Sequence, residues 1–301
     1  MPGSIDGEKT TFDRSILSST YINFLFGAGV NGTALPQLNG FTKTLDVIKR
    51  VGGDISKGFE AAVDDVENAT GRTSIHNAFI KEFKEFHDNI DFKSDPVRHI
   101  EQMLRITYQF VRNTQNRNPG MKQINIYTLN YDEIMQRTLE KLGYIYHCIS
   151  SSNTNSKSSL VNVIGYDYTT KKYVPSFMIS QLHGGIDNPI IPGKEKYKAV
   201  LNAEYFEIAF NMKQHLSRSN SILIVIGYSG GDDHINEIIR DCMYTGLTVY
   251  WYRYSESATL PTILDQSQIH IIDQPDASDK KDSTYLYYED VKRVWEEKSE
   301  E

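Results

Sequence analysis

The most informative pattern in this 301-residue chain is the alternation of short apolar runs with amphipathic segments. The run at residues 21–27, YINFLFG, is aromatic and aliphatic and ends at a glycine, as buried strands commonly do. After residue 119, such runs alternate with segments of helical periodicity. The expected strands are 123–130, 144–150, 221–231, 247–254 and 268–273, the expected helices are 131–143, 203–216, 233–244 and 287–298, and a short helix near Thr262 and a hairpin of 160–166 with 172–185 complete the set. This order predicts an α/β fold, a doubly wound and mostly parallel Rossmann-like sheet.

A smaller helical insert is predicted between the first strand and this alternating region, at residues 42–118. Apolar side chains recur there at helical spacing, and Pro96 suits the first turn of a second helix. The two apolar stripes consist of Ile75, Phe79, Phe83 and Phe86, and of Val97, Ile100, Leu104, Tyr108 and Val111. We therefore expect a single domain over 1–301, in which 20–41 and 119–275 form the Rossmann-like core, 42–118 the insert and 276–301 a C-terminal helix.

Composition excludes several classes of protein. Lys and Arg total 32 against 39 Asp and Glu, and a net charge of −7 argues against broad binding to a phosphate backbone. Cys148 and Cys242 form no C-x-x-C pair, so we expect no structural zinc and two thiols in a reducing cytosol. No apolar run reaches the roughly 18 residues of a membrane span, and the polar start does not resemble a signal peptide. We expect a cytoplasmic protein that binds neither membranes nor nucleic acid directly.

A glycine turn follows the first strand directly. FLFGAGVNG contains G-x-G-x-x-G through Gly27, Gly29 and Gly32, and glycines allow peptide N–H groups to approach a pyrophosphate. A tight connection without a ligand is the alternative. The dehydrogenase fingerprint also needs an acidic residue that ends a second strand about twenty positions on. Asp46 lies at that distance but within a helical pattern, which disfavours a simple oxidoreductase.

Three further polar clusters each follow an apolar strand: TLNYD at 128–132, QLHGG at 181–185 and GYSGGDD at 227–233. Ligands of open α/β sheets bind beyond the carboxyl ends of the strands, so we expect these clusters to share one cleft. Structural roles remain open for several members. Asn130 and Glu133 have the spacing of a capping box, and Asp132 could favour a helix dipole. Asp232 and Asp233 could cap the helix that follows them, and the loop 151–159 could be a lid or a plain connection.

The ordered segments GAGVN, TLNYD, LHGG and GYSGGDD resemble those of sirtuin-like NAD-consuming proteins, over about residues 21–240. The likeness is to the divergent bacterial branch that degrades NAD in antiphage defence, and the chain is similar in size to members that assemble with a HerA-type ATPase. The resemblance implies NAD as the substrate, no metal, a homo-oligomer, and catalysis by Asn130, His183 and Asp132. The residues it implies for NAD binding are Gly27, Ala28, Gly29, Val30, Asn31, Thr128, Gly184, Gly227, Tyr228, Ser229, Asp232 and Asp233.

The chain departs from the family pattern in two ways. Protein-deacylating sirtuins usually carry a four-cysteine zinc module, which two cysteines cannot build. Their G-A-G turn is generally followed by a serine and later by G-I-P-x-F-R, whereas this chain has Asn31 and then ALPQLNGF. We therefore expect a regulated NAD glycohydrolase that releases nicotinamide and ADP-ribose. The alternatives are a silent scaffold that binds NAD or ADP-ribose on an ATPase, and a deacylase or ADP-ribosyltransferase.

Surfaces for assembly are expected on the aromatic C-terminal helix. Its aromatic residues are Tyr285, Tyr287, Tyr288 and Trp295. An exposed stripe would indicate an interface, and a buried stripe would indicate core packing.

Overall fold

A seven-stranded sheet forms the centre of the computed structural model, which describes residues 17, 20–114, 117–150, 164–193, 203–253, 260–265, 268–273 and 283–296, without the side chains of 203–204 and 294–296. The strand order is β3-β6-β2-β1-β7-β8-β9, and all neighbouring pairs are parallel. The strands are β1 (Tyr21–Phe26), β2 (Gln123–Thr128), β3 (Ile145–Ile149), β6 (Ser176–Gln181), β7 (Ser221–Ile226), β8 (Thr248–Tyr252) and β9 (Ile269–Ile272). The predicted doubly wound α/β fold is confirmed.

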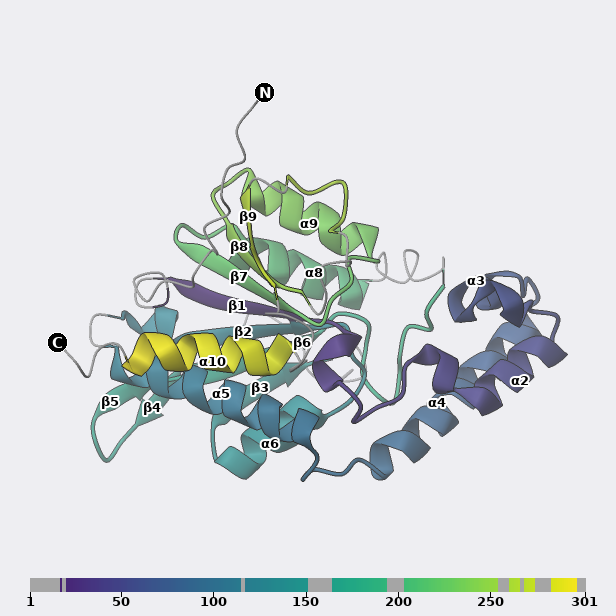
Figure 1. The fold of residues 1–301 in the computed structure, drawn as a ribbon, viewed down its shortest axis with the longest axis horizontal. Helices are drawn as coiled ribbons and strands as arrows, with labels where there is room; N and C mark the ends of the chain where they lie inside the picture. Colours follow the sequence, from purple (N-terminus) through teal and green to yellow (C-terminus); the bar gives the residue numbers. More distant parts are fainter. Residues whose placement is uncertain are drawn as a thin grey trace.

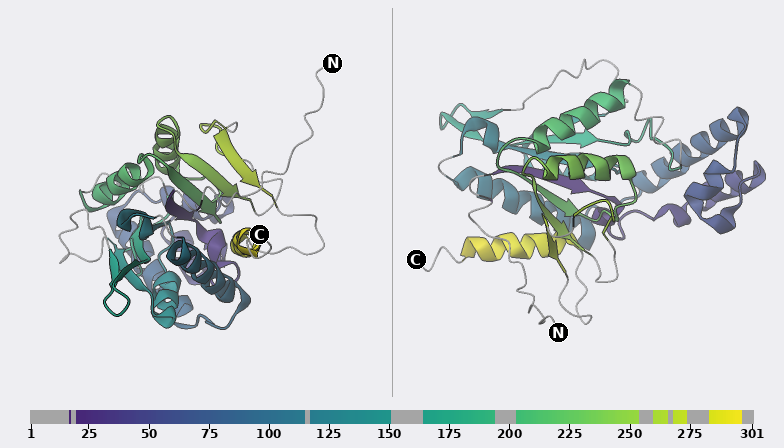
Figure 2. Two further views of the ribbon diagram at one scale, coloured as in Figure 1. Left: turned by 90° about the vertical axis from the view of Figure 1, so that its left-hand side faces the viewer. Right: turned by 90° about the horizontal axis from the view of Figure 1, so that it is seen from above.

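Helices cover both faces of this sheet (Figures 1 and 2). One face carries α5 (Asp95–Asn113), α6 (Ile134–Leu142) and α10 (Ser283–Glu296), and the other carries α8 (Ala203–Leu216) and α9 (Asp233–Met243). Side chains of a strand alternate between the faces. In β1, Phe24 and Phe26 join the apolar cluster that contains α5, while Leu25 joins the cluster that contains α8 and α9. Both faces of the strand are therefore buried, which explains its apolar run from Phe24 to Phe26.

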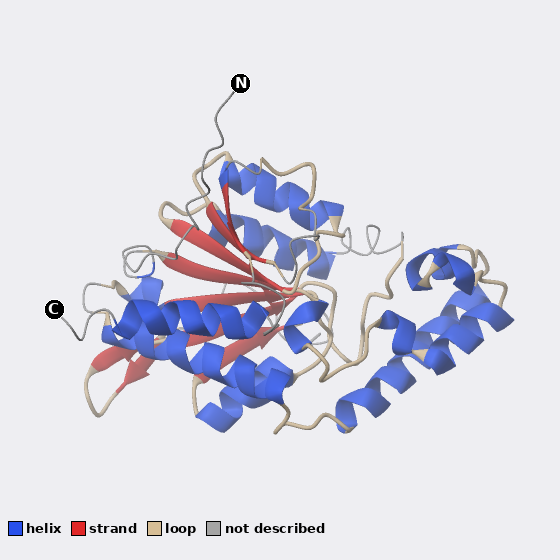
Figure 3. Ribbon diagram, in the orientation of Figure 1, coloured by secondary structure: helices blue, strands red, loops and turns tan. Residues whose placement is uncertain are grey.

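A separate helical module lies beside the carboxyl ends of the strands (Figure 3). It comprises α2 (Thr42–Arg50), α3 (Phe59–Asp64) and α4 (Ala69–Asp88), with the short 3₁₀ helices η2 (Leu38–Gly40) and η3 (Ile55–Lys57). Stacked aromatic rings, among them Phe41 and Phe79 at 5.0 Å, form its core. The buried carboxylate of Glu82 accepts hydrogen bonds from the backbone N–H and the hydroxyl of Thr44, which satisfies the first turn of α2.

The module is shorter than the insert expected at residues 42–118. The helix α5 lies within that range, yet Ile100, Met103 and Leu104 pack in the same apolar cluster as Phe24 of the sheet. The apolar stripe of α5 correctly predicted an amphipathic helix, but periodicity does not say which partner the stripe buries against. In the described structure α5 is a flanking helix of the core.

The expected hairpin divides between two sheets. The strands β4 (Gly165–Asp167) and β5 (Lys172–Val174) pair antiparallel in a small sheet of their own. Pro175 then interrupts the chain, and β6 continues inside the main sheet between β2 and β3. A proline has no N–H to offer a sheet, so the single strand expected at 172–185 was wrong.

Three smaller expectations also changed. The residues around Thr262 form a turn instead of a short helix, and α10 begins at Ser283 instead of Tyr287. Tyr287 is fully buried, with its ring packed edge-on against Phe24 at 5.4 Å, so it cannot serve as an assembly surface. The loop 151–159 and the side chain of Trp295 lie outside the described residues.

Within the part of the chain that is described, no helix combines the length and the apolar composition needed to cross a bilayer.

Candidate functional site

The four polar segments singled out in the sequence follow four adjacent strands. In the order of the sheet these strands are β6, β2, β1 and β7, and all four run parallel. The strands that follow β1 in the chain are first added on one side of it, beginning with β2. From β7 onward they are added on the other side, so the strand order reverses between β1 and β7. Ligand sites of open α/β folds lie at such a switch point. The structure thus brings the four segments to one edge.

The glycine turn packs directly on the segment after β7. A Cβ atom on Gly27 would lie 2.4 Å from the carbonyl oxygen of Gly227, and Gly227 itself has a φ of +66°. The Gly29 N–H donates to that carbonyl over 2.9 Å. Glycine is required at these positions because two backbones meet there without room for a side chain.

The amides of this turn already have acceptors inside the protein. The turn is a short 3₁₀ helix, η1 (Ala28–Asn31), in which the N–H groups of Gly27, Gly29 and Val30 donate to backbone carbonyls. A pyrophosphate could bind to these three amides only after the turn exchanged those hydrogen bonds. Their role in NAD binding stays a prediction.

Asn130 connects the end of β2 with the glycine turn. Its side-chain amide donates to the Gly27 carbonyl over 3.2 Å, and its backbone N–H donates to the Thr128 hydroxyl over 3.1 Å. The helix α6 begins at Ile134 with Glu133 as its N-cap residue, so the capping box considered for Asn130 and Glu133 does not form. Asn130 is half-buried and stands at the carboxyl edge of the sheet.

Asp132 is a buried carboxyl group. Its Oδ2 accepts from the Asn31 amide over 2.6 Å, its Oδ1 accepts from the Ile134 N–H over 2.9 Å, and its backbone carbonyl accepts from Gln181. Burial raises the pKa of Asp132, and the hydrogen bonds from Ile134 and Asn31 oppose that rise. The Oδ1 atom of Asn31 is also buried and accepts no hydrogen bond within the described ranges. Asp132 therefore supports the first turn of α6, the structural role considered for it, and also fixes Asn31.

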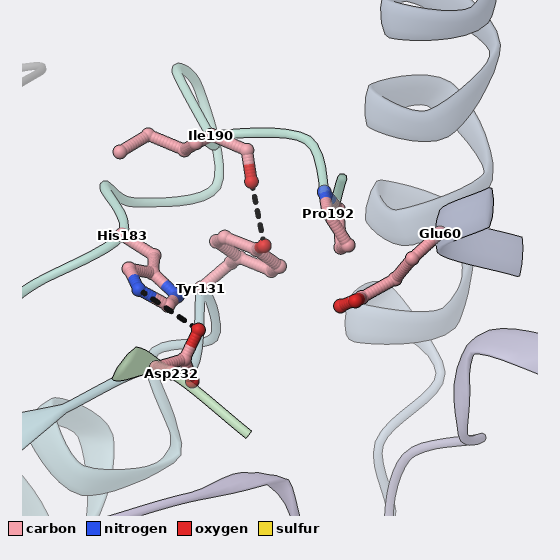
Figure 4. Close-up of a pocket in the computed structure, with 6 residues that line it drawn as sticks. All are labelled: Glu60, Tyr131, His183, Ile190, Pro192 and Asp232. Carbon is pink, nitrogen blue, oxygen red and sulfur yellow. Dashed lines mark hydrogen bonds and ion pairs between the residues drawn. The ribbon is translucent and has the colours of Figure 1, made fainter. Parts of the chain in front are cut away.

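His183 follows β6 and faces a small cavity (Figure 4). Its side chain is buried, and its Nε2 atom lies 3.9 Å from Oδ1 of Asp232. The cavity has a volume of about 70 Å³ and is lined by Glu60, Tyr131, His183, Ile190, Pro192 and Asp232. That volume holds a few water molecules and is far below the several hundred Å³ of a typical ligand pocket. A whole dinucleotide does not fit within this cavity.

Tyr228 serves to hold the loop after β7. Its hydroxyl accepts from the Asp232 N–H over 3.0 Å and donates to Oδ1 of Asn236 over 3.0 Å. The ring is buried and stacks on Trp251 at 5.6 Å. These contacts give Tyr228 a structural role, whereas Ser229 and Asp233 are exposed at the same edge.

Glu60 and Tyr131 line the cavity although the sequence did not single them out. The Tyr131 hydroxyl donates to the Ile190 carbonyl over 2.7 Å, and its ring lies edge-on to Phe79 and Phe83 of the helical module. The aromatic residue inside TLNYD was the available signal for Tyr131. Glu60 belongs to α3, and no pattern in the sequence connects that helix with the sheet edge. Among the described residues, no group of three or more His, Cys, Asp or Glu side chains is arranged to hold a metal ion.

Comparisons with known proteins found similar solved structures and one family model that matches part of the chain. No curated protein matches the chain. Three solved structures are similar in fold. A structure of a Sir2 enzyme gives a TM-score of 0.45 at 13% identity, covering 95% of this chain and 97% of that chain. A complex of a Sir2 homolog with NAD gives 0.46 at 12% identity, covering 99% and 97%. A Sir2 variant with a deacetylated p53 peptide and 3'-O-acetyl ADP ribose gives 0.43 at 14% identity, covering 94% and 96%.

The match to a protein family covers the region from β2 to β9. This region contains Asn130, Asp132, His183 and the segment after β7, and it begins after the glycine turn. The family model that it matches, at residues 124–272, is described as a SIR2-like domain.

Proposed function

We propose that this protein hydrolyses the bond between nicotinamide and ribose in NAD and releases nicotinamide and ADP-ribose. The observation that carries the proposal is that Asn130, Asp132 and His183 follow β2 and β6 at the carboxyl edge of the sheet, where Asn130 and Asp132 are hydrogen-bonded to the glycine turn. An amide that orients the reactants and an imidazole that accepts a proton suit this reaction.

The nitrogen of the leaving nicotinamide is already cationic in NAD, so the base departs neutral and needs no proton donor. Catalysis then depends on orientation and on stabilisation of a ribose with oxocarbenium character. In our proposal Asn130 orients the ribose and a water molecule, and the water oxygen bonds to the ribose carbon as the carbon–nitrogen bond breaks. His183 takes the proton of that water or of a ribose hydroxyl. Asp132 holds the nicotinamide side or supports the developing positive charge, and Ser229 or a neighbouring aspartate contacts the adenosine ribose.

Water is the acceptor that the sequence favours. Two cysteines cannot form a four-cysteine zinc module, and Asn31 stands at the position where the deacylating relatives carry a serine. A regulated role in bacterial antiphage defence, a cytoplasmic location, a homo-oligomer and a HerA-type ATPase partner belong to the same proposal. They are supported by the resemblance of the four ordered segments.

A second candidate is a scaffold that binds NAD or ADP-ribose without turnover. The small cavity at His183 and the turn amides that already donate within the protein concern both candidates equally, because a dinucleotide must reach the site in either case.

The test is to incubate the purified chain with NAD, alone and with candidate ATPases, and to quantify nicotinamide and ADP-ribose chromatographically. We expect Asn130→Ala and His183→Ala each to reduce turnover by about 100-fold or more. Tyr168→Phe, on the exposed hairpin, is the matched control and should keep the wild-type rate. NAD binding without turnover under every condition would establish the scaffold, and turnover that survives both alanine variants would refute the assigned site.

A further inference from the structure

His183 and Asp232 meet although their strands do not. The strands β6 and β7 are separated in the sheet by β2 and β1, so the segments after them must reach across two strand ends. They bring His183 Nε2 and Asp232 Oδ1 to 3.9 Å, and the two side chains are 8% and 11% exposed. A carboxylate near a shielded imidazole acts on it more strongly than it would in water.

Three hydrogen bonds hold the loop that contains Asp232. Tyr228 accepts from its N–H, Asn236 donates its backbone N–H to the Asp232 carbonyl over 3.0 Å, and the side chain of Asn236 donates to the Gly230 carbonyl over 2.8 Å. These bonds fix the loop between β7 and α9 on the first turn of the helix. The position of the carboxylate is thus set before any ligand binds.

The side chain of Asp232 does not act as a helix cap. Asp232 is the N-cap residue of α9, where a carboxylate commonly accepts from the first N–H groups of a helix. Within the described residues its side chain makes no such capping bond, and Figure 4 shows the carboxylate directed at His183. The cap considered from the sequence is therefore not formed.

We propose that Asp232 is the positioning residue of His183, orienting the imidazole and stabilising the imidazolium that forms when His183 accepts a proton. This inference rests on the proposed hydrolase function, and it replaces a contact of Asp232 with the adenosine ribose. The present distance is longer than a hydrogen bond, and pairs of this kind tighten when substrate binds. Among the described residues, the other titratable groups that face His183 are His234, with ring centres 5.6 Å apart, and Glu60 and Tyr131 across the cavity.

A double-mutant cycle tests whether Asp232 acts through His183. We expect Asp232→Asn to lower kcat tenfold or more with little change in KM, and to cause no further loss in the His183→Ala background. Glu237→Gln removes an exposed carboxylate from the same helix and is the matched control, with wild-type kinetics expected. Two results would overturn the inference in favour of a ribose contact. One is a double variant whose kcat falls by the product of the two single losses, and the other is an effect of Asp232→Asn that falls mainly on KM.

An NMR titration of the imidazoles tests the pair without any turnover. Comparison with His183→Ala identifies the His183 ring in the full-length chain without NAD. We expect this ring to take up its proton at a pH about one unit lower in Asp232→Asn than in the wild type, and near the wild-type pH in Asp232→Glu, which keeps the charge. An unchanged midpoint in Asp232→Asn refutes the pairing. If the midpoint shifts in Asp232→Asn but the wild-type protein never hydrolyses NAD, the pairing is supported and only the hydrolase function is refuted.

Discussion

The side-chain amide of Asn31 donates to Asp132 Oδ2 over 2.6 Å, with both residues at most 5% exposed. This bond ties the glycine turn after β1 to the first turn of α6 after β2. The side chain of Asn31, which follows the G-A-G segment, thus has a structural partner in the buried carboxyl group of Asp132.

Replacing Asp132 by asparagine should change how stability depends on pH. Burial raises the pKa of Asp132 in the folded state, so stability is highest while the group is protonated and falls as pH rises through the folded pKa. Asp132→Asn keeps an acceptor for the Ile134 N–H and carries no charge. We expect the free energy of unfolding of the variant, relative to wild type, to increase as pH rises above about 4, where an unfolded aspartate ionises while the buried Asp132 keeps its proton. Urea unfolding at several pH values measures this, with the exposed Asp46→Asn as the control. A constant difference would contradict the prediction.

Alanine at Gly27 should destabilise the fold strongly. Its Cβ would overlap the Gly227 carbonyl and the Cα atom of Tyr228, both of which are backbone atoms that cannot rotate away. We expect a loss of about 3 kcal/mol or more in chemical unfolding. Gly231→Ala is the matched control, because its nearest neighbour would be the Ser229 hydroxyl at 3.8 Å, and it should stay close to wild type. Equal stability of the two variants would show that the turn at Gly27 and the turn at Gly227 can move apart with little loss of folding free energy.

A buried histidine should make the protein sensitive to mild acid. His215 is packed beneath the sheet with Nδ1 2.6 Å from the Tyr127 hydroxyl, and burial lowers its pKa to about 4. Because the unfolded group protonates near pH 6.5, the stability it contributes is present above that pH and is lost as pH falls to about 4. The full effect is about 3 kcal/mol. We expect His215→Gln to flatten the stability profile between these pH values, measured by thermal unfolding, and an unchanged slope would disprove the assignment.

Removing the Tyr131 hydroxyl should loosen the loop that closes the cavity. Tyr131→Phe keeps the aromatic contacts with the helical module and loses the 2.7 Å hydrogen bond to Ile190. We expect a loss of about 1 kcal/mol in stability and faster hydrogen exchange of residues 182–193. Tyr173→Phe, on the exposed hairpin, should change neither quantity. Unchanged exchange in Tyr131→Phe would show that other contacts hold the loop.

The sequence predicted the parallel sheet and its four polar strand ends because local patterns determine both. An apolar run that ends in glycines marks a buried strand and the turn after it, as at Phe26 and Gly27. What it could not predict depends on partners distant in the chain. The apolar stripe of α5 did not reveal that this helix packs on the sheet. The spacing of Asn130 and Glu133 suggested a capping box and did not reveal the hydrogen bond from Asn130 to the Gly27 carbonyl. The pairing of His183 with Asp232 likewise needs the order of the strands.

The place of β6 between β2 and β3 sets the order in which one side of the sheet can form. A ribosome makes β3 before β6, yet β3 has no neighbour in the sheet until β6 has been made. Until then β3 keeps an unpaired edge, and loop-closure entropy opposes the long-range pairing that covers it. Both His183 and the small hairpin adjoin this late strand. The side of the sheet that contains β3 and the His183 part of the site therefore form together, and a nascent chain that stops before residue 176 would have neither.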